Sequence, residues 1–165
     1  MKFSFALFAL FLAFGCSDPC ADVAGTPTLT LAGSSDDGSA FELFDDGAER
    51  TLLQGPQIGM HIWLQLRLEG FCPSGIEVDR RVVDATDALV EIQRSPLRFT
   101  EGVTPGSFEL DNPIAMQVCP AERPVVGETL RFSVRAEDTR GNVDIAEKAF
   151  VPVCPTATCE ICGTP

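Results

Sequence analysis

The 165-residue chain lacks several residue types on which common active sites depend. It has no tyrosine, one tryptophan and one histidine, His61, so a site that needs two imidazoles cannot form within one chain. Basic residues are also scarce: 12 Lys and Arg stand against 24 Asp and Glu, for a net charge of −12. Such a surface is repelled by nucleic-acid phosphates and anionic lipid headgroups, which argues against nucleic-acid binding and against membrane attachment through a basic patch.

Recognisable catalytic patterns are missing as well. No serine stands in a G-x-S-x-G turn, and no glycine-rich phosphate-binding loop occurs. We therefore expect no enzymatic activity and no cofactor.

The first 15 residues have the layout of an export signal. Lys2 supplies one positive charge, and a mostly apolar run from Phe3 leads to Gly15 and Cys16. The run is too short to span a bilayer as a helix. Its end, LAFGC, resembles the bacterial lipobox, in which a small residue precedes a cysteine that is lipidated and becomes the mature N-terminus. The resemblance implies a lipid anchor at Cys16; the alternative is an ordinary signal peptide that is cut nearby.

These features predict four segments along the chain. They are a lipoprotein signal peptide (1–15), a lipid-anchored tether (16–27), a β-sandwich (28–153) and a Cys-rich C-terminal tail (154–165). Without the signal the chain keeps 11 basic and 24 acidic residues, a net charge of −13. About 150 residues suit one domain. By resemblance to lipoproteins, Ser17 after the lipidated cysteine implies sorting to the outer membrane.

The cysteine count agrees with a lipidated Cys16. Setting it aside leaves an even set, which in an exported chain predicts three disulfides among Cys20, Cys72, Cys119, Cys154, Cys159 and Cys162. Of the possible pairings we expect Cys72 with Cys119, because both stand in Cys-Pro steps after strand-like runs, and Cys20 with the C-terminal tail. A bridge from Cys20 to the body would hold the domain within about 14 Å of Cys16.

Beyond Thr28, short alternating or β-branched segments separated by Gly, Pro, Asn and Asp predict nine or ten strands and no helix. In His61–Leu68, even-numbered apolar residues share one face, and His61, Trp63, Gln65 and Arg67 share the other. Pro113 within the run 108–118 marks an edge strand or a bend. The pattern predicts an antiparallel β-sandwich. The other expected strands are 28–31, 40–44, 50–53, 76–83, 89–93, 97–99, 129–137 and 143–153.

Two segments resemble known families. Residues 134–143, VRAEDTRGNV, resemble the last hairpin of bacterial Ig-like and fibronectin-like modules, which implies an Ig-like Greek-key sandwich of about nine strands for residues 28–153. The antibody hallmarks, a tyrosine corner and a Cys…Trp…Cys spacing, are missing. Residues 55–63, GPQIGMHIW, resemble a stretch of predicted bacterial lipoproteins that have no assigned activity.

The polar face of 61–68 is the candidate partner patch. Trp and Arg are enriched at interface hot spots, so His61, Trp63, Gln65 and Arg67 would contact an envelope protein or a glycan. The alternative is that another strand or the C-terminal tail covers this face.

Metal and redox chemistry are the competing hypotheses. Copper suits a set of Met60, His61 and a cysteine, but neighbouring residues of a strand point to opposite faces, which favours a structural His61 and no metal. Cys159 and Cys162 form a C-x-x-C pair, yet no helix follows and no second pair has matching spacing, so disulfides are favoured over redox or zinc chemistry. Turns are favoured over calcium binding for the acidic residues Asp36, Asp37, Glu42, Asp45, Asp46 and Glu49.

The sequence thus predicts a lipid-anchored, extracytoplasmic, non-catalytic binding or structural module of the bacterial outer membrane. The alternative is a periplasmic copper, zinc or thiol-redox protein that uses His61 and the C-terminal cysteines.

Replacing the proposed lipid attachment site tests this prediction. We expect Cys16→Ala to fold normally and to leave the membrane fraction. The acyl chains on Cys16 would be what holds the protein at the membrane, since the acidic chain has no basic patch to attach it. Cell fractionation and the intact mass of the mature protein measure both effects, with Ser17→Ala as the neighbouring control. Retention of Cys16→Ala in membranes, or an unacylated wild-type product, would contradict the anchor.

Overall fold

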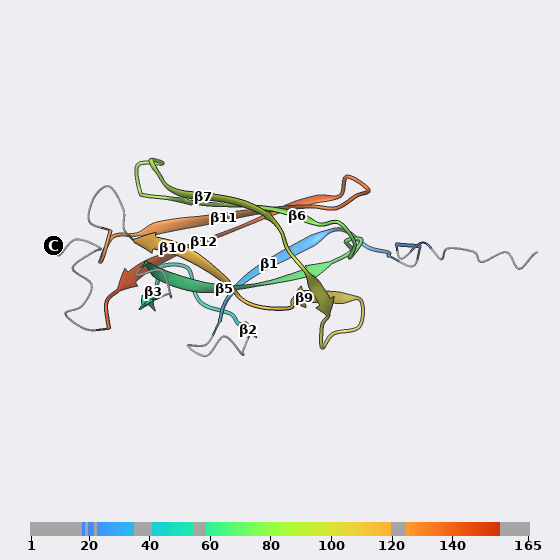
Figure 1. Cartoon of the computed structure of the whole chain (residues 1–165), viewed down its shortest axis with the longest axis horizontal. Helices are drawn as coiled ribbons and strands as arrows, with labels where there is room; N and C mark the ends of the chain where they lie inside the picture. The colour runs from blue at the N-terminus through green and yellow to red at the C-terminus, as the bar shows by residue number, and fades with distance from the viewer. Residues whose placement is uncertain are drawn as a thin grey trace, which may run out of the picture.

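Two packed β-sheets make up the part of the chain that the computed structural model describes, namely residues 18, 20–21, 23–34, 41–54, 59–119 and 125–155 (Figure 1). This part contains no helix, and so no helix of the length and apolar character needed to cross a membrane. It forms 12 strands instead of about nine: β1 (Thr28–Ser34), β2 (Phe41–Glu42), β3 (Ala48–Thr51), β4 (Leu53–Gln54), β5 (Met60–Glu69), β6 (Glu77–Val83), β7 (Leu89–Pro96), β8 (Phe99–Glu101), β9 (Ser107–Leu110), β10 (Ile114–Cys119), β11 (Leu130–Glu137) and β12 (Val143–Val153).

Strand β5 is the centre of the seven-stranded sheet. Its C-terminal half pairs with β1 from Leu64 to Glu69, and its first two residues pair with β4. The opposite edge pairs with β10 and then with β9. Strands β9 and β10 were expected as one run; Pro113 lies between them, so the bend predicted from this proline is confirmed.

The five-stranded sheet has the order β3-β12-β11-β6-β7. Strands β6, β7, β11 and β12 pair antiparallel, whereas β3 runs parallel to β12, so the expectation of a purely antiparallel fold is wrong at this edge. The expected strand 50–53 is also divided: β3 belongs to this sheet and β4 to the other, and the fully buried Leu52 stands between them. The chain crosses from sheet to sheet at Leu52, which a local alternation pattern does not reveal.

The core lies between the sheets and is built by strand alternation. Along β5, Ile62, Leu64, Leu66 and Leu68 are buried, and the apolar row of β11 that faces them is equally inaccessible, which confirms the predicted inward faces. The rings of Phe132 and Phe150 stack within this core with centroids 4.4 Å apart.

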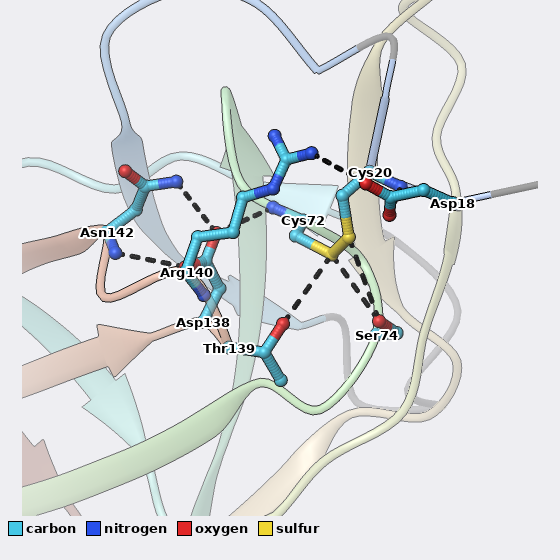
Figure 2. Close-up of a disulfide and its surroundings, with 8 residues drawn as sticks. All are labelled: Asp18, Cys20, Cys72, Ser74, Asp138, Thr139, Arg140 and Asn142. Atoms are coloured by element: carbon cyan, nitrogen blue, oxygen red, sulfur yellow. Dashed lines mark hydrogen bonds and ion pairs between the residues drawn. A yellow bond between two sulfur atoms is a disulfide. The ribbon is translucent and has the colours of Figure 1, made fainter.

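A disulfide fastens the segment before β1 to one end of the sandwich. Cys20 bonds to Cys72, whose Cα lies 4.9 Å away, in the loop between β5 and β6 (Figure 2). The expected pairings of Cys72 with Cys119 and of Cys20 with the C-terminal tail are therefore wrong, because chain folding brings residues 20 and 72 together at this loop. Closing a loop with a sequence separation of 52 stabilises the fold by about 4 kcal/mol in the chain-entropy account.

The buried carboxylate of Asp138 joins this loop to the β11–β12 turn (Figure 2). Its Oδ2 accepts the Cys72 N–H at 2.7 Å and the Asn142 Nδ2 at 2.9 Å, and its Oδ1 accepts the N–H groups of Arg140 and Asn142 at 2.9 and 3.0 Å. The Arg140 side chain also reaches Asp18, with Nη2 and Oδ2 3.1 Å apart. Turn, loop and tether are thus connected at one end of the protein.

These contacts set the ionisation of Asp138. Burial raises the pKa of its carboxyl, but the hydrogen bonds from Cys72, Asn142 and Arg140 together outweigh burial, so the pKa lies below the ordinary value of 3.8. A depressed folded-state pKa gives stabilisation that is complete above the unfolded pKa and is lost as the pH falls through the folded pKa.

We expect Asp138→Ala to lower the free energy of unfolding by about 3 kcal/mol, because it leaves the buried Cys72 N–H without its acceptor. Asp138→Asn keeps the shape but loses the charge and one acceptor oxygen, so its deficit should shrink as the pH falls from about 7 to below the ordinary carboxyl pKa of 3.8, because the wild-type carboxylate then loses its stabilising effect. Urea unfolding at the two ends of this range measures the change. A deficit of Asp138→Asn that grows on acidification would contradict the assignment.

Candidate binding site

The four residues predicted as a partner patch share the outer face of β5. His61, Trp63 and Arg67 are half-buried, and Gln65 is only 8% exposed. The structure therefore places them together on one face, but they do not form a uniformly open surface.

The Arg67 side chain is engaged in contacts within the protein. Its guanidinium carbon lies 4.0 Å from the centroid of the Phe41 ring of β2, and its Nη2 lies 2.7 Å from Oε1 of Glu109 on β9. A second bond joins Nε to the same oxygen at 2.8 Å. Arg67 thus spans three strands and is held by intramolecular contacts, which favours a structural role for this member of the patch.

Trp63, at the other end of the face, lines a cleft of about 290 Å³ at the side of the sandwich. The size is at the lower end for ligand sites, enough for one small group. Both sheets contribute, since β3 belongs to one and β2, β4 and β5 to the other. The cleft is lined by Ser34, Glu42, Glu49, Arg50, Thr51, Leu53, Ile62 and Trp63.

The cleft coincides with an interruption in the seven-stranded sheet. Strand β1 pairs with β5 only as far as Gly33 and Leu64, and β4 pairs with β5 only from His61. Ile62 and Trp63 therefore have no register partner on this edge among the described strands. Strands β2 and β3, which also line the cleft, are both edge strands of their sheets.

Arg50 brings a positive charge into the cleft. Its Nη2 donates to the backbone oxygen of Ser34 at 3.1 Å, and its guanidinium carbon lies 5.2 Å from the Phe44 ring centroid. The site at Gly33 makes room for it, because a Cβ there would lie 2.4 Å from Nη2. Glycine is thus required at this point of β1 for the close approach of the guanidinium.

Ser34 adds a buried hydroxyl to the same cleft. The residue is 4% exposed, and its Oγ has no hydrogen-bond partner within the described part of the chain. A buried polar atom without a partner is uncommon in folded proteins and calls for a ligand or water. Glu42 and Glu49 are exposed beside it, so the cleft combines donors with carboxylate acceptors.

The cysteines within the described ranges are bonded. Besides Cys20 and Cys72, both Cys119 and Cys154 are disulfide-bonded. Cys16, Cys159 and Cys162 lie outside the described residues. No group of three His, Cys, Asp or Glu that could hold a metal ion occurs in the described part. Met60 is buried, whereas the neighbouring His61 belongs to the outer face. The Nδ1 atom of His61 is buried and has no hydrogen-bond partner within the described part of the chain.

The acidic residues expected in turns are partly described. At 45–47 the turn is present: Asp45 accepts the Ala48 N–H at 3.1 Å through its backbone oxygen, and Asp46 Oδ1 accepts the Ala149 N–H at 2.7 Å. Asp36 and Asp37 lie outside the described residues.

Sequence reasoning did not identify Arg50 or Ser34 as site residues. The sequence did contain one indication that Arg50 is unusual. It is the only basic residue between Lys2 and Arg67, and it follows a run of acidic residues. Its role depends on β3 joining the second sheet, which is a non-local pairing.

No family model matches the chain, and no curated protein matches it. Among solved structures, it is similar to CopC from Methylosinus trichosporium OB3b at 15% identity, over 67% of this chain and 88% of that one, with a TM-score of 0.32. It is also similar to murine CRIg at 16% identity, over 80% of this chain and 100% of that one, with a TM-score of 0.31. The two sheets of the sandwich are defined by the chain's own strand pairing.

The contacts of Arg67 predict a stability effect. We expect Arg67→Ala to lower the free energy of unfolding by about 1–2 kcal/mol, because it removes a ring contact and a partly buried ion pair. Arg67→Lys should recover part of the loss by keeping the charge without the flat face. Urea denaturation measures both variants. Equal stability of wild type and Arg67→Ala would show that the Phe41 and Glu109 contacts contribute nothing.

Proposed function

We propose that the chain is a lipid-anchored, extracytoplasmic, non-catalytic module of the bacterial outer membrane that binds an envelope partner in the Trp63 cleft. The buried Ser34 hydroxyl, which has no hydrogen-bond partner among the described residues and belongs to the cleft that Arg50 lines, is the observation on which the binding role depends. The lipobox-like segment and the bonded cysteines support export, since disulfides persist in oxidising compartments.

We also propose that the sandwich is Ig-like with Greek-key connections. Strands β1, β5 and β10 adjoin in one sheet, as strands A, B and E do in that fold, and β12, β11, β6 and β7 adjoin in the other, as G, F, C and C′ do. The chain changes sheet between β5 and β6 and again between β10 and β11. This order supports the assignment independently of the low-scoring structural matches.

The tether supports an orientation for the anchored protein. Cys20 is fixed to the loop that follows β5, so a lipid on Cys16 would lie within about 14 Å of that end. Trp63 lies six residues before the end of β5 at Glu69, a span of about 20 Å. Figure 1 shows β3, which lines the cleft, toward the opposite end of the sandwich from the start of β1. The cleft would then be on the half that faces away from the membrane, where a partner can reach it.

Site-specific cross-linking in cells tests the binding role. We replace Trp63 by benzoylphenylalanine in the full-length chain, which keeps an aromatic side chain, and place the same group at Val103 as a control. Val103 is 93% exposed and lies in the loop between β8 and β9, near the tethered end. A binding cleft predicts one defined adduct from position 63 that is missing from position 103.

Identical adducts from both positions, or none from position 63, would contradict a binding role for the cleft. Fractionation of the same cells reports the anchor separately, so a failed anchor and a failed cleft give different results.

A further inference from the structure

Arg50 is a half-buried cation for which the described residues supply no carboxylate. Among these residues its side chain makes one hydrogen bond, to the Ser34 backbone oxygen, and contacts the Phe44 ring. Glu42 and Glu49 line the same cleft, yet neither pairs with it. Buried or half-buried guanidinium groups are usually paired, and the described residues engage one of the five N–H donors of this one.

The guanidinium is held in position before any ligand arrives. On one side it lies against the backbone of β1 at Gly33, where a Cβ would approach its Nη2 and Cζ to 2.4 and 2.8 Å. The guanidinium also lies over the Phe44 ring, and the Phe44 backbone oxygen accepts Lys148 Nζ at 3.1 Å. A planar, pre-positioned fork of donors matches the two oxygens of a carboxylate.

Ser34 lines the same cleft and has a further donor. Its Oγ is buried and has no hydrogen-bond partner among the described residues, and its backbone oxygen is the atom that accepts from Arg50. A carboxylate that bonds to Arg50 could therefore also accept a hydrogen bond from the Ser34 hydroxyl in the same cleft.

The surrounding strands favour a peptide as the carrier of that carboxylate. The pairing of β5 is interrupted at Ile62 and Trp63, and the edge strands β2 and β3 flank the interruption. Exposed strand edges bind extended peptides through main-chain hydrogen bonds. The cleft of about 290 Å³ has room for a terminal residue but not for a folded segment.

We propose that the cleft binds the C-terminal carboxylate of an extended peptide, with Arg50 as its receptor and Ser34 as a second donor. This inference depends on the proposed binding role of the cleft. It also specifies the envelope partner as a protein with an accessible C-terminus and small final residues. The protein carries a net charge of −12, so attraction of the anion is local to Arg50 and does not come from the overall field.

The test compares two peptides on the full-length protein purified in detergent. The probes are N-acetyl-trialanine with a free C-terminus and its C-terminal amide, followed by calorimetry and by the fluorescence of Trp63, the single tryptophan. We expect the free acid to bind at least tenfold more tightly than the amide, because the amide removes the charge that Arg50 recognises. Equal binding of acid and amide, or no binding of either, would overturn the proposal.

Three variants localise the effect. Arg50→Gln removes the charge, and Gly33→Ala displaces the guanidinium while keeping it, so both should reduce the preference for the acid at least tenfold. Arg81→Ala removes an exposed arginine on β6 of the other sheet and should leave the preference unchanged. Urea midpoints confirm that each variant is folded. A preference that survives both cleft variants would show that the peptide binds elsewhere.

A sugar carboxylate is the competing source, and D-glucuronate is the probe for it. Binding of glucuronate without binding of the peptide acid would overturn the peptide assignment. A position-63 adduct in cells combined with no binding of the peptide acid would refute this inference alone and leave the proposed function standing.

Discussion

Burial of the even-numbered face of β5 is the constraint on which the other features depend. Ile62, Leu64, Leu66 and Leu68 are almost inaccessible, and each buried side chain of this kind stabilises the fold by about 1.5–3 kcal/mol. The same strand pairs with β1, β4, β9 and β10, so its position determines where each of them lies. With β5 in place, its odd-numbered residues are directed to the outer face, and the place where β1 stops pairing with it becomes the wall of a cleft.

The two ends of the sandwich have different roles. At one end, the Cys20–Cys72 disulfide and the Asp138 carboxylate connect the tether, a loop and the β11–β12 turn through covalent and charge-assisted bonds (Figure 2). Toward the other end, Arg50 and Ser34 keep polar groups whose bonding capacity is not used within the described chain. Rigid fastening at one end and unsatisfied groups at the other support the proposal of a module that is anchored at one end and binds a partner at the other.

How much the sequence revealed depended on the range of each interaction. The faces of β5 and β11 followed from alternation, a local property that survives in any sheet. The cysteine partners did not follow, because several pairings satisfy the same count and only the path of the chain selects among them. The parallel β3–β12 pair and the crossing at Leu52 were not predicted for the same reason. The site was missed with them, because Arg50 lies in the cleft only when β3 pairs in the five-stranded sheet and its guanidinium reaches Ser34 of the other sheet.

The position of the Cys20–Cys72 bond also determines how the protein bears mechanical load. A pull on the chain before Cys20 enters the sandwich at Cys72, between β5 and β6, and bypasses residues 21–71. Strand β1, whose N-terminal end would otherwise be peeled from β5 one hydrogen bond at a time, carries none of that force. The load instead enters beside β5, which pairs with β1, β4, β9 and β10 and is therefore held by more strands than β1 is.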